Sequence, residues 1–221
     1  MSDILGRGVY SLRDAAKLTG LKPRRVREWF LGRKAEPDRS RVFQPDFEPI
    51  GTVHAISFLD LVDLYVAGHL REHGVSMPTV RKVYAKLRSD YNTPHPFARK
   101  ELLTDGQSVF VRGIDKAGEE EIYDALTKQK VFPEIILPFL RQIDYDRSSS
   151  LATRWHIATG VVVDPGKNFG RPVLERLCIP TYVIAAEYAA NGRNLDRVAG
   201  WYNLTSDEVL AAVRFETGLA A

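Results

Sequence analysis

Three stretches in the first 90 residues carry apolar side chains at the spacing of a helix. At about 100° per residue, apolar positions at i, i+3, i+4 and i+7 fall on one helical face. The three predicted faces comprise Val26, Trp29 and Phe30; Phe58, Leu61, Val62 and Tyr65; and Val80, Val83, Tyr84 and Leu87. Each stretch therefore predicts an amphipathic helix that buries one side.

Helix-capping residues indicate where the first of these helices begin and end. Ser11 with Asp14 three places on predicts a capping box, and Gly20 closes that helix. Pro23 falls in the first turn of the next helix, where its missing N–H costs nothing. We interpret residues 10–30 as two short helices joined by a turn.

The same capping signals recur downstream. Ser57 with Asp60 predicts a second capping box, and the helix that it opens is expected to run to about His73 and to stop at Gly74. Ser76 is expected to cap the helix that follows.

The outer face of the second predicted helix is positive, because Arg24, Arg25 and Arg27 lie opposite its apolar side. Residues 1–41 contain eleven Lys or Arg and five Asp or Glu, whereas the whole chain has a net charge of only +3. A recognition helix needs this layout, since it buries one face and presents cations to a phosphate-lined groove. The alternative is a surface helix with a solvated basic face.

Residues 32–56 combine turn-forming residues with two short β-prone pieces, at 42–43 and 52–56. A basic hairpin directly after a recognition helix would be a wing that reaches backbone phosphates or the minor groove. The basic residues along this turn are Arg33, Lys34, Arg39 and Arg41. A mobile linker is the alternative interpretation.

The middle of the chain predicts a linker followed by small α and β elements. Residues 92–97, NTPHPF, contain two prolines and are interpreted as a linker. A turn signal at 104–107 before the strand-like SVFVR suggests a hairpin. Glu119 is expected to open a helix that runs through Leu126, because acidic residues in a first turn favour the helix dipole.

Two further patterns complete this middle segment. Residues 131–143 are apolar and interrupted by proline, so we expect them to form core or a partner surface rather than a site. Residues 151–158 and 160–164 predict two strands.

From residue 164 onward, a loop rich in Gly and Pro precedes three predicted short helices. The expected capping signals are Thr181 and Asn191-Gly192 around the first helix, Asn194 before the second, and Thr205 with Glu208 as a capping box for the third. The third helix opens with Asp207 and Glu208, which a duplex would repel. Residues 161–221 hold six basic and seven acidic residues, so we expect a protein-binding or dimerising module.

No pattern for catalysis or metal binding is complete in this sequence. His69 and His73 stand at i, i+4, but no further ligand completes a metal site, and GKNFG at 166–170 is only loosely similar to a nucleotide-binding turn. Cys178 stands between apolar residues and is expected to be buried packing. We therefore expect no enzyme activity, no catalytic residues, no metal and no cofactor. Without an apolar run of bilayer length or a signal peptide, the expected location is the cytoplasm.

Two parts of the chain resemble known families. The segment YSLRDAAKLTGLKPRRVREW, followed by SFLDLVDLYVAGHLREHGVSMPTVRKVYAKL, resembles the MerR-type winged helix-turn-helix. That resemblance implies that the helix carrying Arg24, Arg25 and Arg27 enters the major groove and that the wing contacts the backbone. The full set of predicted DNA-binding residues is Arg13, Lys22, Arg24, Arg25, Arg27, Arg33, Lys34, Arg39 and Arg41.

The C-terminal stretch resembles the trihelical family of unknown function numbered 433. The matching residues are DP, GRPVL, IPT, ANG, VAGWY and the final V-x-x-A-V-x-F-E. A MerR-like head joined to this tail is similar to a VapB-type antitoxin. The resemblance implies a PIN-like ribonuclease toxin as partner, DNA of its own promoter as ligand, and a homodimer. The predicted partner-binding residues are Arg171, Arg176, Tyr182, Arg193, Arg197 and Trp201.

The predicted architecture is mainly α with small β elements. It comprises a MerR-like winged helix-turn-helix at 1–91, a linker and small α+β segment at 92–160, and a three-helix, helix-turn-helix-like domain at 161–221. The function expected is that of an antitoxin that represses its own operon. The alternatives are a stand-alone MerR-like regulator whose C-terminal half senses a small ligand, and an adaptor that has lost DNA binding.

Overall fold

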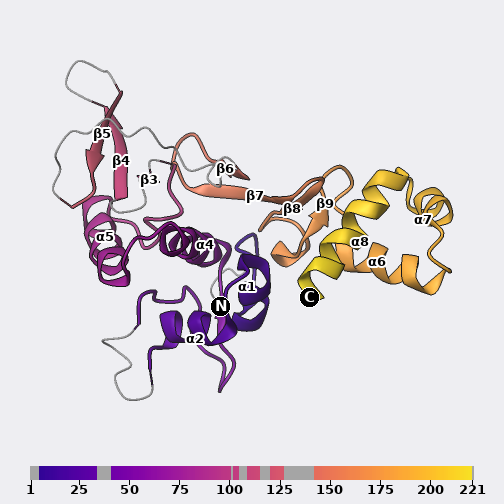
Figure 1. The fold of residues 1–221 in the computed structure, drawn as a ribbon, viewed down its shortest axis with the longest axis horizontal. Coiled ribbons are helices and arrows are strands. Elements are labelled where there is room, and N and C mark those ends of the chain that lie inside the picture. Colours follow the sequence, from indigo (N-terminus) through magenta and orange to yellow (C-terminus); the bar gives the residue numbers. More distant parts are fainter. Residues whose placement is uncertain are drawn as a thin grey trace. The chain divides into compact units, whose positions relative to one another are not determined.

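The computed structural model describes residues 5–33, 41–100, 102–104, 109–114, 120–126 and 142–220. The chain groups into two compact units: Ser11–Ala152, here called the head unit, and Met1–Tyr10 with Thr153–Ala221, the tail unit. Helices predominate, and the small sheets pair their strands antiparallel (Figure 1). The predicted fold class is thereby confirmed, whereas the MerR-like type of the head stays a prediction. Among the described residues, no helix is long and apolar enough to cross a membrane.

The predicted pair of short helices is present as α1 (Leu12–Thr19) and α2 (Pro23–Leu31). The Ser11 hydroxyl accepts a hydrogen bond from the Asp14 backbone N–H at 3.1 Å. Gly20 ends α1 with a φ of 69°, a left-handed conformation that glycine adopts without steric cost. The predicted N-cap at Ser11 and the predicted end at Gly20 are confirmed; of the predicted capping box only the Ser11 half forms, and the Asp14 carboxylate accepts from the Ser11 hydroxyl at 2.7 Å.

The core of the head unit is built around α4 (Phe58–Glu72), which is buried along almost its whole length. Ser57 and Asp60 form the predicted capping box, with backbone N–H to side-chain distances of 3.0 and 3.1 Å. The next helix, α5 (Met77–Asp90), begins after Ser76 as predicted. The apolar faces predicted for α4 and α5 are buried, so the periodicity identified the core correctly.

The predicted wing hairpin differs from the structure. Val42 and Phe43 form no strand; their N–H groups donate to the Trp29 carbonyl at 2.8 and 3.0 Å, and the Phe43 ring is buried against Trp29 and Phe30. β2 (Ala55–Ile56) pairs instead with β1 (Tyr10–Ser11). The β-prone pair at 42–43 is core, because burial of an aromatic ring outweighs the weak strand preference of two residues.

The predicted linker at 92–97 also belongs to the core. Thr93, His95 and Phe97 are buried, and the Phe97 ring packs edge-on against Tyr84 with 5.1 Å between centroids. The prolines end the helical pattern, as expected, but the segment then packs against α4 and α5 instead of leaving the unit.

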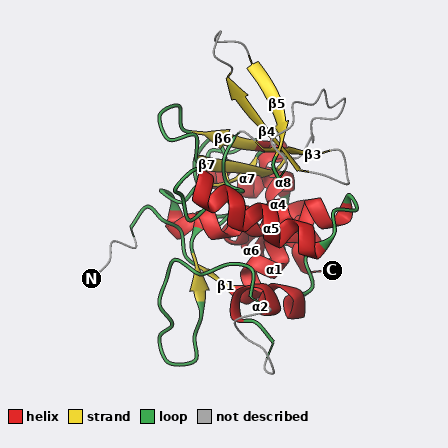
Figure 2. Cartoon of the chain, turned by 90° about the vertical axis from the view of Figure 1, so that its left-hand side faces the viewer, coloured by secondary structure: helices red, strands yellow, loops and turns green. Residues whose placement is uncertain are grey.

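A small antiparallel sheet follows, with strands β3 (Leu102–Thr104), β4 (Val109–Ile114) and β5 (Glu120–Asp124) in that order. The predicted hairpin is confirmed, although part of its turn, at 105–108, lies outside the described residues. The helix expected from Glu119 to Leu126 is wrong, since Glu120–Asp124 form the strand β5, which pairs with β4; Glu119 lies outside the described residues. A favourable charge at a helix N-terminus contributes only about 0.3–1 kcal/mol, less than a complete strand ladder. Figures 1 and 2 place this sheet at the end of the head unit far from α2.

The remaining middle residues give a mixed outcome. β6 (Ile143–Tyr145) is a short strand of the head unit. Most of the apolar stretch at 131–143 lies outside the described residues. The two strands predicted at 151–158 and 160–164 are confirmed as β7 (Ala152–Ala158) and β8 (Val161–Val163).

The tail unit joins β7, β8 and β9 (Val173–Leu174) to a segment from the start of the chain. The Tyr10 hydroxyl donates to the Gly170 carbonyl at 2.8 Å, and the Val9 N–H donates to the Phe169 carbonyl at 3.0 Å. Phe169 and Gly170 lie in a short 3₁₀ turn, η2 (Asn168–Gly170). Residues before the first helix of the head unit are thus part of the tail unit.

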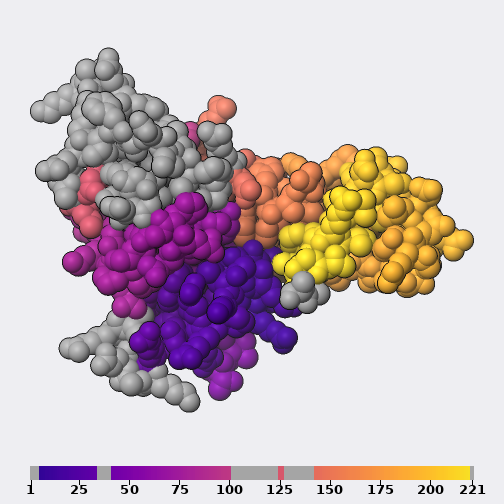
Figure 3. All heavy atoms as spheres, viewed as in Figure 1, coloured from indigo at the N-terminus to yellow at the C-terminus, as the bar shows by residue number. Residues whose placement is uncertain are grey.

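Three helices complete the tail unit: α6 (Thr181–Ala190), α7 (Leu195–Tyr202) and α8 (Ser206–Ala220) (Figure 1). Their atoms make up the yellow and light-orange part of the space-filling view (Figure 3). The predicted ends at Asn191 and Asn194 and the Thr205–Glu208 capping box are confirmed. Thr181 is not the cap of α6, because Pro180 occupies that position. The shared core, including the sheet, is Val161, Leu174, Ile184, Val198, Ala199, Leu204, Val209 and Ala212.

Cys178 is only half-buried, and its φ of 55° places it in a left-handed turn. The prediction that this residue is buried packing is therefore wrong. Its apolar neighbours in sequence follow β9 into a surface loop, where Leu177 is exposed.

Candidate nucleic-acid interface and partner surface

The outer face of α2 is the most basic helical surface that the sequence singled out. Val26, Trp29 and Phe30 are buried on its inner side, at 0%, 6% and 0% exposure. Arg24 and Arg27 are exposed, as is Arg25 between them. The amphipathic character predicted for this helix is confirmed. Its exposed arginines are accessible to a polyanion without a change in the fold.

A basic hollow of about 380 Å³ lies beside the N-terminal half of α2. Four predicted DNA-binding residues lie on its wall, together with Arg71 from the C-terminal end of α4. Its lining is Lys22, Arg24, Arg25, Glu28, Trp29, Arg33, Arg71 and Met77. Glu28 is the one acid there, and it is paired with Arg24 at 3.0 Å and with Arg33 at 3.5 Å.

Sequence reasoning missed Arg71, because a basic residue in the last turn of a helix is commonly explained by the helix dipole. In the structure, Arg71 Nη1 donates to the Val75 carbonyl at 2.5 Å, which orients the guanidinium at the turn between α4 and α5. Only the three-dimensional contact between this turn and α2 brings Arg71 to the hollow.

A second hollow, of about 530 Å³, lies between α2 and the segment 41–54. Arg27 of α2 and Arg41 and His54 of the segment provide its basic groups, and Glu48 is the one acid. Its lining is Arg27, Phe30, Leu31, Arg41, Gln44, Pro45, Phe47, Glu48, Pro49 and His54. α2 thus carries a basic hollow on each side.

The other predicted DNA-binding residues lie apart from these hollows or cannot be placed. Arg13 is exposed on α1 and lines neither hollow. Lys34 and Arg39 lie outside the described residues.

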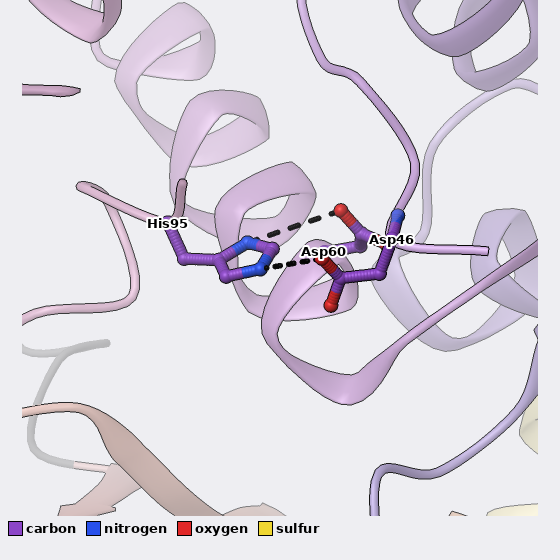
Figure 4. A group of neighbouring side chains, drawn as sticks. All are labelled: Asp46, Asp60 and His95. Atoms are coloured by element: carbon purple, nitrogen blue, oxygen red, sulfur yellow. Dashed lines mark hydrogen bonds and ion pairs between the residues drawn. The ribbon is translucent and has the colours of Figure 1, made fainter. Parts of the chain in front are cut away.

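A buried ion-pair cluster holds the segment 41–54 against α4 (Figure 4). The Asp46 N–H donates to the Asp60 carboxylate at 2.9 Å, and the Asp46 carboxylate lies 3.1 Å from His95 Nε2. His95 Nδ1 lies 3.0 Å from the carboxylate of Asp63 and 3.9 Å from that of Asp60. His95 therefore connects segment 93–98, α4 and the loop that forms one wall of the second hollow.

Burial alone would lower the pKa of His95, but its hydrogen bonds to Asp46 and Asp63 and the charges of both carboxylates raise it to about 10. Burial raises the pKa of Asp60 to about 6, although backbone N–H groups of Asp46 and Ser57 oppose this shift. At neutral pH the imidazolium is thus held between carboxylates, and the loop is fixed by charge as well as by packing.

Among the described residues, Asp46, Asp60 and His95 also have the spacing of a metal site, with ligand atoms within 4.8 Å of one another. Both nitrogens of His95 already meet a carboxylate, and one oxygen of Asp60 accepts two backbone hydrogen bonds. We therefore interpret the group as an ion-pair cluster that fixes the loop.

Of the predicted partner-binding residues, Arg176 is held internally. Its guanidinium donates to both carboxylate oxygens of Glu208 at 2.8 Å and to the Asn203 carbonyl at 2.7 Å. The hydrogen bond from Arg176 lowers the pKa of Glu208 to about 2. This residue therefore stabilises the start of α8 through the same Glu208 that forms its capping box.

The other predicted partner-binding residues are exposed on the tail unit. Arg171 lies over the Tyr182 ring, with 5.7 Å between the guanidinium carbon and the ring centroid. Arg193 is exposed just before α7, Arg197 is exposed on α7, and Trp201, also on α7, is 57% exposed. The structure pairs Arg171 with Tyr182 but gathers no single cluster from the six.

These features define a class of protein: a helical head unit with a basic, exposed second helix, and a tail unit of three helices on a small sheet. Residues 161–215 match the family model described as "Protein of unknown function (DUF433)". The chain is similar to a Mycobacterium tuberculosis protein named "Putative antitoxin VapB45": the two are 24% identical in an alignment 222 positions long, which covers 93% of this chain and 92% of the relative. The resemblance that the sequence indicated, to a VapB-type antitoxin with this C-terminal domain, is confirmed.

The fold has a counterpart of known structure. The crystal structure of Rv2018 from Mycobacterium tuberculosis matches with a TM-score of 0.68 and 21% identity, and the match covers 92% of this chain and 96% of that one. Both units therefore recur together, in one chain, in a solved structure.

Proposed function

We propose that the protein is the antitoxin of a type II toxin–antitoxin pair, which neutralises a PIN-like ribonuclease toxin and represses its own operon by binding DNA. The observation that carries the proposal is the similarity, along 93% of the chain, to a protein named as a VapB antitoxin. The proposal gives the protein no catalytic activity.

The head unit is assigned to DNA because α2 presents Arg24, Arg25 and Arg27 on a face with a basic hollow on each side. In this assignment α2 lies in the major groove and the two hollows receive phosphates of the strands that border it. A homodimer would present two such helices to half-sites about one helical turn apart.

The tail unit is assigned to the toxin. A PIN-like ribonuclease holds Mg²⁺ with acidic residues, and an arginine placed among them would neutralise the charge that binds the metal. Arg171, Arg193 and Arg197 are the candidates, since Arg176 is already bonded to Glu208.

One observation favours the alternative, a MerR-like regulator that senses a small ligand. The tail unit has a hollow of about 530 Å³ against α8, within the size range of small-molecule sites. Its lining is Ala158, Thr159, Asp207, Leu210, Ala211, Arg214 and Phe215. This alternative predicts that a small molecule releases the DNA and that the protein has no protein partner.

The DNA half of the proposal is tested by binding of the protein to its own promoter at several salt concentrations. Replacing Arg24, Arg25 and Arg27 by Ala is expected to weaken binding at least about tenfold and to reduce the salt slope by about 3, since each lost phosphate contact removes about 0.9. Lys82→Ala with Arg88→Ala on α5 is a matched control, because these cations are exposed on the same unit and line neither hollow. An unchanged slope in the arginine variant would contradict the assignment.

A further inference from the structure

One face of α8 carries two opposite charges that the tail unit does not use. Asp207 and Arg214 are both exposed, and within the described part of the chain neither side chain forms a hydrogen bond or an ion pair. The other two charged residues of this helix, Glu208 and Glu216, are bonded to side chains of the same unit. Asp207 and Arg214 are therefore available to another molecule.

Between these two charges the same face of α8 is apolar. Leu210 and Ala211 follow Asp207 at i+3 and i+4 and are partly exposed, so the four residues from Asp207 to Arg214 form one stripe along the helix. The hollow of about 530 Å³ lies along this stripe, and its lining includes Phe215 and the C-terminal end of β7. The stripe is thus apolar at its centre and charged at its ends, which is the usual layout of a protein–protein contact.

The stripe is also complementary to itself. Asp207 and Arg214 are seven residues apart, about 10 Å along the helix, and Leu210 and Ala211 lie on either side of the midpoint. A two-fold axis through this midpoint turns a second α8 antiparallel and sets each Asp207 opposite Arg214 of the other copy. A two-fold interface requires a surface that matches itself, and this charge pattern does so. The small Ala211 at the centre allows the two helix axes to approach to about 8 Å.

We propose that a second copy of the chain docks on this stripe, so that two α8 helices pack antiparallel and form two ion pairs between Asp207 and Arg214. The inference rests on the homodimer of the proposed function and names the surface that joins its subunits. The occupant is a second copy because the two ends of the stripe match each other in charge, whereas a surface for an unrelated protein needs no such symmetry. Leu210 of each copy would fill part of the hollow of the other and so remove apolar surface from water.

The test is the dissociation constant of the full-length dimer in sedimentation equilibrium. Asp207→Arg and Arg214→Asp each place like charges opposite one another, so each variant alone is expected to dimerise at least about tenfold more weakly than the wild type. An equimolar mixture of the two variants is expected to regain dimers of wild-type affinity, because a copy that is positive at both positions then faces a copy that is negative at both. This recovery would also show that both variants are folded.

Arg197→Asp is the matched control for the charge reversals. Arg197 is exposed on α7 of the same unit and does not line the hollow. Its reversal is expected to leave the dissociation constant of the dimer unchanged.

Three results would overturn the inference. If the single variants dimerise as tightly as the wild type, the subunits meet elsewhere and the hollow is left to a small ligand. If each single variant is monomeric and their mixture is monomeric too, the two charges do not face each other across the interface. If the wild type is monomeric at every concentration, the homodimer of the proposed function fails as well, whereas its antitoxin part is decided separately by toxin binding.

Discussion

His95 shows how one buried side chain orders the proposed DNA-binding surface. It is 3% exposed, lies between the carboxylates of Asp46 and Asp63, and ties the loop 41–54 to α4. Asp63 also accepts from the Phe97 and Ala98 N–H groups at 2.9 Å, so the same cluster fixes the segment 93–98. A buried pair of this kind is costly to break, because removal of one partner leaves a charge without compensation.

The stability of the head unit is expected to depend on the protonation of His95. Its pKa is raised to about 10 in the folded protein, so its stabilising contribution is complete below the unfolded pKa of about 6.5 and is lost as pH rises through about 10. At pH 6 the His95→Gln variant is expected to be less stable than the wild type. Urea unfolding at pH 6, 8 and 10 should show that this difference in the free energy of unfolding shrinks by a few kcal/mol as the pH rises. Parallel pH profiles of the two proteins would contradict this role.

Gly170 is expected to be indispensable for the tail unit. Its φ is 82°, and an added Cβ would overlap the Tyr10 hydroxyl that donates to its carbonyl. Gly170→Ala is therefore expected to destabilise the protein by about 2–4 kcal/mol. Gly200→Ala is the control, since no atom lies within 4 Å of an added Cβ there and α7 is helical at that position. Equal thermal shifts in the two variants would show that this packing is not needed.

At the scale of elements, capping residues and periodicity were sufficient to predict the helices of both units. Ser11, Ser57 and Thr205 mark helix starts because their hydroxyls satisfy N–H groups that the helix cannot. The strand β5 was not predicted because its acidic residues favour a helix start, whereas pairing with the preceding strand β4 decides its conformation. The packing of segment 92–97 could not be predicted because it depends on α4, which is distant in sequence. The same holds for the candidate site. A helical wheel was sufficient to predict that Arg24, Arg25 and Arg27 lie on the exposed face of α2. Arg71 and the His95 cluster could not be predicted, because tertiary contacts bring them to the site.

Arg176 is expected to act on α8 and not on a partner directly. Arg176→Ala should lower the thermal midpoint of unfolding only slightly, because the Arg176 side chain is 48% exposed and water screens its ion pair with Glu208. Arg193→Ala, an exposed control on the same unit, should not change it. If Arg176→Ala weakens partner binding while leaving the thermal midpoint unchanged, Arg176 contacts the partner after all.

At the scale of the whole molecule, the chain carries its two proposed activities on separate units. The basic residues concentrate in residues 1–41, and residues 161–221 hold six basic against seven acidic residues. Nucleic-acid affinity is therefore expected from the head unit alone, and protein recognition from the tail unit, where Tyr182 and Trp201 are exposed at 48% and 57%.

Replacing Tyr182 and Trp201 by Ala is expected to weaken toxin binding at least about tenfold, since exposed aromatic residues dominate the energetics of many interfaces. Promoter binding at matched salt concentration should not change, because neither residue belongs to the head unit. Titration calorimetry against the toxin and anisotropy with promoter DNA separate the two effects. A loss of DNA affinity with intact toxin binding would reverse the assignment of the two units.

The most direct test of the central claim is co-expression with the product of the neighbouring gene, followed by purification and an assay of RNA cleavage. The antitoxin account predicts that the neighbour alone arrests growth and cleaves RNA, and that the two proteins co-elute as a complex in which growth is restored and cleavage is abolished. If both proteins are folded and neither a complex nor growth rescue is found, the protein is not the antitoxin of that partner and the account is wrong.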